Sequence, residues 1–209
     1  MWGAPSLGSG MEEAQRLFGV APAPGGVHPG LGTCNALLSL ADDQYLEVIA
    51  PDPAQDLSGT LGARLAALDA PELVTWAAAA ADLDAVAAAA AGASLRVRGP
   101  VLTERQAPDG GLLRWRLLFV GGHAFGGLVP FFIDWMDTPH PARTNPLAGR
   151  FLGLDVRAPD AAGLNAIYAS LGITVRATEA VSAVLAARIA TATGEVVLQS
   201  APGAQGWSL

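Results

Sequence analysis

The chain has 209 residues, of which 51% are hydrophobic, and a mean hydropathy of +0.36, so it can form the core of one large domain or two closely joined halves. All twelve basic residues are arginine, the net charge is −7 and no basic cluster stands out, which argues against a nucleic-acid partner. The single cysteine, Cys34, excludes an internal disulfide and a thiolate metal site. Residues 1–15 lack the basic and apolar regions of a signal peptide, and the alanine-rich stretch at 73–93 is too broken for a membrane span, so we expect a cytoplasmic protein.

The first third of the chain predicts a strand, a helix and further strands. WGA at 2–4 is typical of a short strand, and Met11–Phe18 predicts a helix with acidic residues in its first turn. A loop rich in proline and glycine, APAPGG, follows. Apolar runs then predict strands at Asn35–Leu40 and Tyr45–Ala50.

The same order of elements occurs twice more. At 72–135 we expect a strand in ELVTWAAA, a helix over Leu83–Ala91, a strand in SLRVRG or VLTERQ, a PDGG turn at 108–111, and strands in LLRWRLLFV and GLVPFFIDW. At 152–200 we expect a strand in LGLDVRAP, a helix over Ala161–Leu171, and strands in ITVRAT, VLAARIAT and EVVLQSA. The repeats predict a first βαβββ module at 1–53, a linker at 54–71, a second module at 72–142 and a third, weaker module at 151–202, all in a single compact globular unit.

A βαβββ module cannot bury its sheet alone, because one helix covers only one face. Pairing of such modules gives an α+β fold, an open half-barrel with the helices outside and a cup lined by alternate residues of each strand. Such a cup is a natural small-molecule pocket. The alternative is a general α+β sandwich in which the repeat is accidental.

Two blocks of the sequence resemble a known family. GVAPAPGGVHPGLGTCNALLSL…YLEVIAPDP, together with LLRWRL and VPFFIDW…HP, is similar to the glyoxalase-like branch of the vicinal oxygen chelate superfamily, which includes glyoxalase I, extradiol dioxygenases and bleomycin-resistance proteins. The resemblance covers roughly residues 2–142. It implies paired βαβββ modules, one divalent metal (Zn, Ni, Mn, Fe or Mg) in the cup, and lyase, isomerase or dioxygenase chemistry.

The resemblance implies metal ligands on the first and last strands of each module. Glu47 in YLEVIAP matches the acidic ligand position, whereas the expected histidine of the first strand would fall before Met1. Either the start codon is misassigned or the protein never had that ligand. In the second module Phe132 stands at the position that corresponds to Glu47, and Asp134 lies two residues further on the same face. Glu47 and Asp134 are thus the candidate metal ligands, and the ligand set is incomplete.

Strand alternation places Glu47 opposite an apolar face, so we expect it to point into the cup, as a ligand or proton carrier. His140, which follows the strand of Asp134, is the second candidate catalytic residue. His28 is either a structural loop residue or a contact at the rim of the cup. Two arginines of LLRWRLLFV either clamp an anion or lie on a solvated face, with Glu104 as a partner. The candidate substrate-binding residues are His28, Asn35, Arg114, Arg116, Phe132 and Trp135.

These residues favour a protein that binds a small molecule in the cup, with metal-dependent catalysis as one interpretation. The alternative is a metal-free protein that binds or sequesters a small molecule without catalysis. A third interpretation is a structural or dimerisation domain. We expect a small-molecule ligand and no nucleic-acid or membrane partner, and paired modules of this kind also suggest a homodimer.

Overall fold

The computed structural model describes residues 1–106, 111–202 and 207, so most of the predicted PDGG turn lies outside the described residues. The chain forms two compact units. Unit 1 comprises Met1–Leu73, His140–Gly153 and Ala187–Leu198, and unit 2 comprises Val74–Pro139, Leu154–Ala186 and Gln199–Leu209. Each unit therefore combines stretches that are far apart in the sequence.

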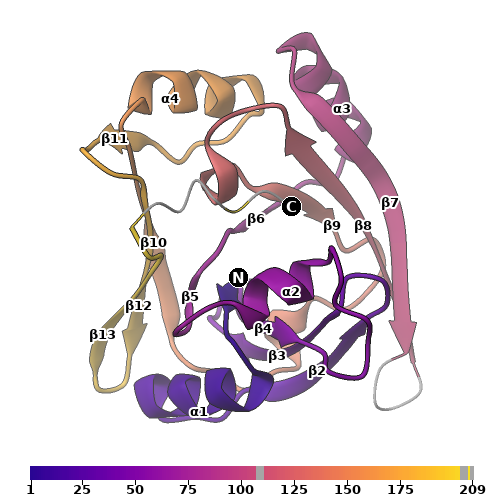
Figure 1. The fold of residues 1–209 in the computed structure, drawn as a ribbon, viewed down its shortest axis with the longest axis vertical. Coiled ribbons are helices and arrows are strands. Elements are labelled where there is room, and N and C mark those ends of the chain that lie inside the picture. The colour runs from indigo at the N-terminus through magenta and orange to yellow at the C-terminus, as the bar shows by residue number, and fades with distance from the viewer. Residues whose placement is uncertain (107–110, 203–206, 208–209) are drawn as a thin grey trace. The chain divides into compact units, whose positions relative to one another are not determined.

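Four α-helices separate runs of strands along the described residues (Figure 1). The helices are α1 (Leu7–Phe18), α2 (Leu61–Ala66), α3 (Leu83–Gly92) and α4 (Ala161–Ser170), with the single-turn 3-10 helices η1 (Gly126–Leu128) and η2 (Pro141–Arg143). The strands are β1 (Trp2–Gly3), β2 (Ala23–His28), β3 (Thr33–Ser39), β4 (Tyr45–Pro51), β5 (Glu72–Leu73), β6 (Ala77–Ala79), β7 (Arg96–Gln106), β8 (Leu112–Gly121), β9 (Phe131–Asp134), β10 (Arg150–Ala158), β11 (Ala177–Glu179), β12 (Val184–Thr191) and β13 (Gly194–Gln199).

The first two repeats have the same sheet topology. The first sheet has the order β2-β3-β4-β1-β5 and the second has the order β6-β9-β8-β7. In each, the first strand of the module lies parallel to the last one, β1 beside β4 and β6 beside β9, while the other strand pairs of the module are antiparallel. The predicted α+β fold with repeated βαβββ modules is therefore confirmed.

The third repeat keeps its helix but changes its strand order. Its sheet has the order β11-β10-β12-β13, so the first strand of the repeat lies parallel to its second strand and not to its last. Helix α4 begins where the Asp160 side chain accepts a hydrogen bond from the Gly163 N–H (2.8 Å). The helix was predicted from the sequence, but the order of the strands was not.

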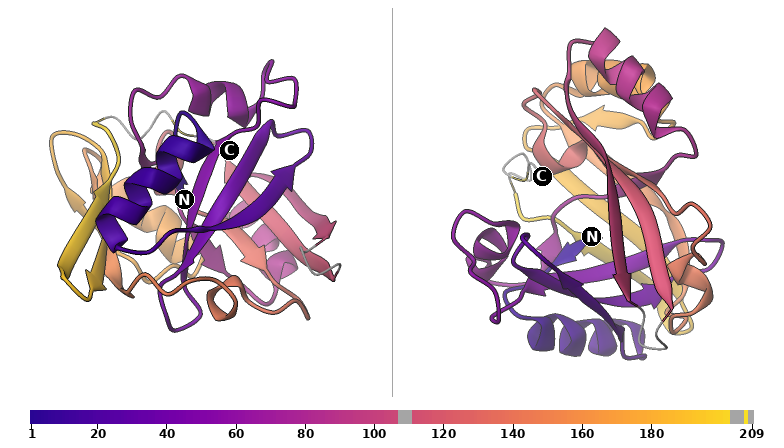
Figure 2. Two further views of the ribbon diagram at one scale, coloured as in Figure 1. Left: turned by 90° about the horizontal axis from the view of Figure 1, so that it is seen from below. Right: turned by 90° about the vertical axis from the view of Figure 1, so that its right-hand side faces the viewer.

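Helix α1 covers one face of the first sheet. Leu46, Val48 and Ala50 of β4 are buried, as the alternation predicted. Helix α1 lies along this face (Figure 2), and its Gly10 approaches so closely that an added Cβ would lie 2.7 Å from Val48 Cγ1. Glu47, between these residues, therefore points to the other face of the sheet.

Several boundaries differ from the sequence prediction. Helix α1 begins at Leu7 and not at Met11, because the Ser6 hydroxyl accepts a hydrogen bond from the Ser9 N–H and caps the first turn. ELVTWAAA is two strands and not one: β5 pairs with β1 in the first sheet, and β6 pairs with β9 in the second. The two strand candidates SLRVRG and VLTERQ are parts of one strand, β7, with a bulge between Arg98 and Val101. Within the described ranges, no helix has the length and apolar character to cross a bilayer.

Candidate functional site

A connected row of polar side chains lies on the face of the first sheet opposite α1. Asn35 of β3 and Glu47 of β4 belong to adjacent antiparallel strands, and Asn35 Nδ2 donates a hydrogen bond to Glu47 Oε1 (2.7 Å). The same Nδ2 lies 3.4 Å from His28 Nε2 at the end of β2. The two hydrogens of the amide thus reach one carboxylate and one imidazole nitrogen.

The orientation of the Asn35 amide is set by the backbone of β2. The Gly26 N–H donates to Asn35 Oδ1 (2.9 Å), so the carbonyl side of the amide faces β2 and the NH₂ group faces Glu47. Gly25 is the residue that makes room for it, because an added Cβ there would lie 2.1 Å from Asn35 Oδ1. The two glycines of APGG therefore position this side chain: Gly25 leaves space for the Asn35 amide, and Gly26 donates a hydrogen bond to it.

His28 is held by a second contact. Its Nδ1 lies 2.9 Å from the hydroxyl oxygen of Thr33, which is fully buried. Because the Asn35 amide presents a donor to Nε2, the tautomer with hydrogen on Nδ1 satisfies both contacts. The sequence left His28 as either a structural loop residue or a contact at the rim of the cup. In the structure it lies at the end of β2 and contacts Thr33 and Asn35.

The second predicted catalytic residue, His140, contacts Tyr45 in unit 1. The two rings meet edge to face at 5.5 Å, and Tyr45 lies two residues before Glu47 on the same strand face. Burial, and secondly the charge of Glu47, raise the pKa of the Tyr45 phenol, so it stays protonated. His140 Nδ1 accepts a hydrogen bond from the Ala142 N–H (3.2 Å) at the start of η2, and burial lowers the pKa of this imidazole.

The donor set around Glu47 does not fit a divalent metal. The Asn35 NH₂ group already donates to the carboxylate and faces the imidazole, and the Gly26 contact prevents the amide from turning its oxygen toward them. An amide NH₂ is not a metal ligand. In the part of the chain that the structure describes, no group of three or more His, Cys, Asp or Glu side chains could hold a metal ion.

Asp134, the other predicted ligand, belongs to unit 2 and forms an ion pair there. Its Oδ2 accepts hydrogen bonds from Arg116 Nε (3.3 Å) and Nη2 (3.1 Å), and its Oδ1 accepts one from the Met136 N–H (2.9 Å). Arg116 also reaches Asp84 of α3 at 3.4 Å, so it lies on the helix side of the second sheet. Arg114, on the same side of β8, pairs with Glu104 (3.4 Å) as expected from the sequence.

The two predicted aromatic walls, Phe132 and Trp135, lie in different surroundings. Phe132 is buried on the face that Asp134 shares, opposite Leu118 of β8. Trp135 contacts Trp115 with 5.4 Å between the ring centroids. Unit 2 also contains a small hollow, on the opposite face of β8 and β9. Neither Phe132 nor Trp135 lines it, whereas the neighbouring Phe131 does.

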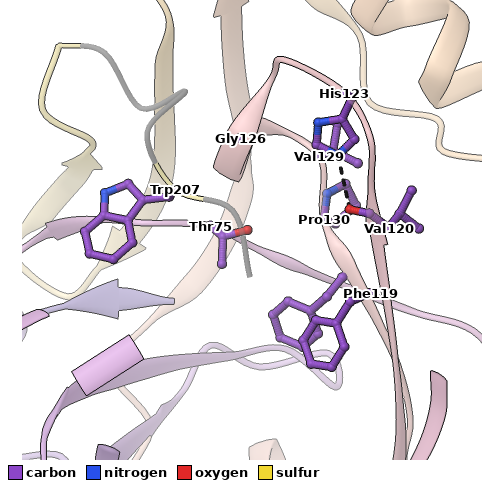
Figure 3. Close-up of a pocket in the computed structure, with 9 residues that line it drawn as sticks. Thr75, Phe119, Val120, His123, Gly126, Val129, Pro130 and Trp207 are labelled. Atoms are coloured by element: carbon purple, nitrogen blue, oxygen red, sulfur yellow. Dashed lines mark hydrogen bonds between the residues drawn. The ribbon is translucent and has the colours of Figure 1, made fainter. Parts of the chain in front are cut away.

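The hollow of unit 2 lies on the opposite face of β8 and β9 and is shown in Figure 3. Phe119 and Phe131 line the hollow with 5.8 Å between their ring centroids and form one wall. Figure 3 shows Thr75 and Trp207 at the other end and His123 in the loop after β8. His123 Nε2 donates to the Val120 carbonyl (3.1 Å). Burial lowers the pKa of His123, an effect that this hydrogen bond opposes.

Sequence reasoning missed three residues of these sites. Gly25 was part of a loop in the prediction, although a GG pair within a β-rich segment is a known signal of close backbone approach. Thr33 and Trp207 gave no signal in the sequence, because their roles depend on strand register and on the return of the chain to unit 2.

The comparisons with known proteins agree with the fold. A solved structure of a hypothetical protein from Staphylococcus aureus has a TM-score of 0.61 at 17% identity and covers 86% of this chain and 76% of that chain. Methylmalonyl-CoA epimerase from Mycobacterium tuberculosis has a TM-score of 0.48 at 18% identity and covers 65% of this chain and 84% of that one. No curated protein matches the chain. The family described as Glyoxalase-like domain matches residues 1–172, and the chain belongs to this family.

Proposed function

We propose that this glyoxalase-like protein binds a small polar molecule at Glu47, on the face of the first sheet opposite α1, without a metal ion, and that Glu47 accepts a hydrogen bond or a proton from that molecule. The observation that supports the proposal is the fixed Asn35 amide, which donates to Glu47 Oε1 at 2.7 Å. A carboxylate oxygen accepts more than one hydrogen bond, so a ligand can donate to Glu47 while Asn35 stays in place.

The fixed amide also indicates which ligands suit the site. A carboxylate held in one position binds a donor without first losing conformational freedom, and hydrogen bonds to a charged acceptor are among the stronger ones in proteins. Hydroxyl and ammonium groups are donors of this kind. The ligand class is therefore a small molecule with an alcohol or amine group.

Side-chain amide resonances of the protein test this proposal directly. The chain has three asparagines, so Asn145 and Asn165 serve as internal controls for Asn35 in ¹H–¹⁵N spectra. Titration with ethanolamine, 1,2-propanediol and lactate should shift the Asn35 NH₂ signals saturably for at least one probe and leave the controls in place. If no probe shifts Asn35, the proposal is wrong.

Two variants identify the group that binds. Glu47→Gln keeps the size of the side chain and removes its charge, so it should abolish the saturable shift. Glu104→Gln, an exposed residue in unit 2, should leave it unchanged. Calorimetric titration with Zn²⁺ and Mn²⁺ tests the alternative that the family resemblance implies. Saturable metal binding that Glu47→Gln removes would support a metal-dependent function instead.

A further inference from the structure

The turn that joins β2 to β3 places a histidine and a threonine at its two ends. His28 and Thr33 stand directly opposite each other in the antiparallel register, and the His28 carbonyl accepts a hydrogen bond from the Leu31 N–H (3.1 Å). Side chains of opposite residues on adjacent strands lie next to each other on the same face of the sheet. The register of this hairpin therefore brings the His28 imidazole to the Thr33 hydroxyl.

Thr33 is the least exposed residue of the polar row. It has no exposed surface, and its Oγ1 lies 2.9 Å from His28 Nδ1. Asn35 lies two residues further along β3, on the same face, and is also buried. Because buried polar groups are hydrogen-bonded, the position of each hydrogen in this row can be assigned from the neighbouring atoms.

The assignment begins at the backbone. The Gly26 N–H can only donate, so the Asn35 atom that it reaches is the amide oxygen, and the atom that faces the Glu47 carboxylate is the nitrogen. His28 Nε2, 3.4 Å from that nitrogen, must then accept, and the neutral ring carries its hydrogen on Nδ1. Nδ1 donates to Thr33 Oγ1, so the row runs from the amide through the imidazole to the hydroxyl.

The opposite tautomer would break the row at Asn35. With its hydrogen on Nε2, the His28 ring would present a donor to the amide NH₂ group, which is itself a donor. The amide cannot turn over to relieve this conflict, because its oxygen would lose the Gly26 N–H and face the Glu47 carboxylate. An acceptor at Nδ1 therefore preserves the contact between His28 and Asn35, and Thr33 supplies that acceptor.

We propose that Thr33 is a positioning residue for Glu47. Its hydroxyl oxygen holds His28 in the tautomer with hydrogen on Nδ1, and His28 Nε2 accepts one hydrogen of the Asn35 amide. The amide is thereby held where it donates its other hydrogen to Glu47. Only the last step, the binding of a donor ligand at Glu47, rests on the proposed function. The tautomer of His28 and the position of the amide are properties of the protein without a ligand.

The three histidines of the chain allow the tautomer to be measured against internal controls. His123 Nε2 donates to the Val120 carbonyl, and His140 Nδ1 accepts from the Ala142 N–H, so both rings carry their hydrogen on Nε2. Long-range ¹H–¹⁵N spectra, recorded at a pH at which imidazoles are neutral, distinguish the two ring nitrogens. We expect the hydrogen on Nδ1 in His28 alone. A native His28 ring with its hydrogen on Nε2 would overturn the proposal, and this measurement needs no variant.

Two substitutions of Thr33 separate its hydroxyl from its shape. Thr33→Val replaces the hydroxyl with a methyl group, so His28 should lose its preference for the Nδ1 hydrogen and the Asn35 NH₂ hydrogens should exchange with water several-fold faster. Thr33→Ser keeps the hydroxyl and should retain the native tautomer and exchange rate. Thr178→Val, at an exposed strand position of unit 2, is the matched control and should change neither. A native tautomer together with native exchange rates in Thr33→Val would contradict the role of Thr33.

Ligand titration tests the last step. Ethanolamine, 1,2-propanediol and lactate are again the probes, and the probe that binds should bind Thr33→Val about two- to tenfold more weakly, as expected for the loss of one hydrogen bond. Thr33→Ser should bind it with native affinity. An unchanged affinity in Thr33→Val would show that Thr33 does not position Glu47. If the native protein binds no probe, the proposed function is wrong, whereas the tautomer and the exchange rates still decide whether Thr33 positions Asn35.

Discussion

Substitution of Gly25 by alanine should destabilise the protein through Asn35 alone. The φ angle of Gly25 lies outside the left-handed region, so the backbone itself accepts alanine. The new Cβ would lie 2.1 Å from Asn35 Oδ1, closer than any real contact, and the amide must move. Its hydrogen bonds from the Gly26 N–H and to Glu47 are then lost or weakened.

The expected magnitude follows from these two effects. Overpacking of a well-filled site costs about 1–3 kcal/mol. Loss of a hydrogen bond to a charged group costs about 1.5–3 kcal/mol. Gly25→Ala should therefore lower the free energy of unfolding by about 2.5–6 kcal/mol, measured from the midpoint of urea unfolding. Gly121→Ala is the matched control, because that glycine is also at a strand position and an added Cβ meets nothing within 4 Å.

A double-mutant cycle tests the reasoning itself. In an Asn35→Ala background the main steric conflict is absent, and Gly25→Ala should cost about 1 kcal/mol or less. The coupling between the two sites should then exceed about 1 kcal/mol. If Gly25→Ala lowers the free energy of unfolding as much in the Asn35→Ala background as in the native protein, Gly25 does not act by leaving space for the Asn35 amide.

Three further predictions concern packing and protonation. Gly10→Ala should destabilise by about 1–3 kcal/mol in urea unfolding, because its Cβ would lie 2.7 Å from the β4 side chain beneath it, whereas Gly8→Ala in the same helix meets nothing and should stabilise by about 0.5–1 kcal/mol. Tyr168→Phe removes a buried 2.6 Å hydrogen bond to the Leu128 carbonyl and should cost about 1 kcal/mol, and a stability equal to that of the native protein would contradict this. Because burial lowers the pKa of His123 in the folded state, the unfolded chain takes up this proton first, so its contribution to stability is present above the ordinary pKa of 6.5 and is lost as the pH falls through it. The stability of His123→Gln should accordingly fall less on acidification, and a pKa of His123 at or above 6.5 in NMR titration would refute the cause.

The orientation of Glu47 could be predicted from the sequence because it depends on a local pattern. Leu46, Val48 and Ala50 are apolar at every second position, and a strand with period two must place the residues between them on the other face. The structure confirms that these three are buried. A one-residue error in register would have reversed the result, and the pattern excludes it.

The aromatic wall could not be predicted in the same way. In FFID, Phe131, Phe132 and Ile133 are all apolar and all buried, so alternation gives no information about which face each residue occupies. The face is fixed by pairing with β8, where Arg116 stands opposite Asp134. That register, and not any feature of β9, places Phe131 in the hollow and Phe132 on the other side.

The side chains that contact Glu47, directly or through Asn35, come from one short stretch of the sequence. Gly25, His28 and Asn35 come from the same stretch that resembles the glyoxalase-like family, and all three are connected to Glu47 through one amide. A metal ion bound at Glu47 Oε1 would compete with the Asn35 donor, whereas an alcohol or ammonium group can donate to the carboxylate while Asn35 stays in place. Because the Gly26 N–H fixes the amide on its other side, this preference is a property of the β2 backbone and not of Glu47 alone. The hydrogen-bonding preference of Glu47 thus depends on the β2 backbone as well as on the carboxylate itself.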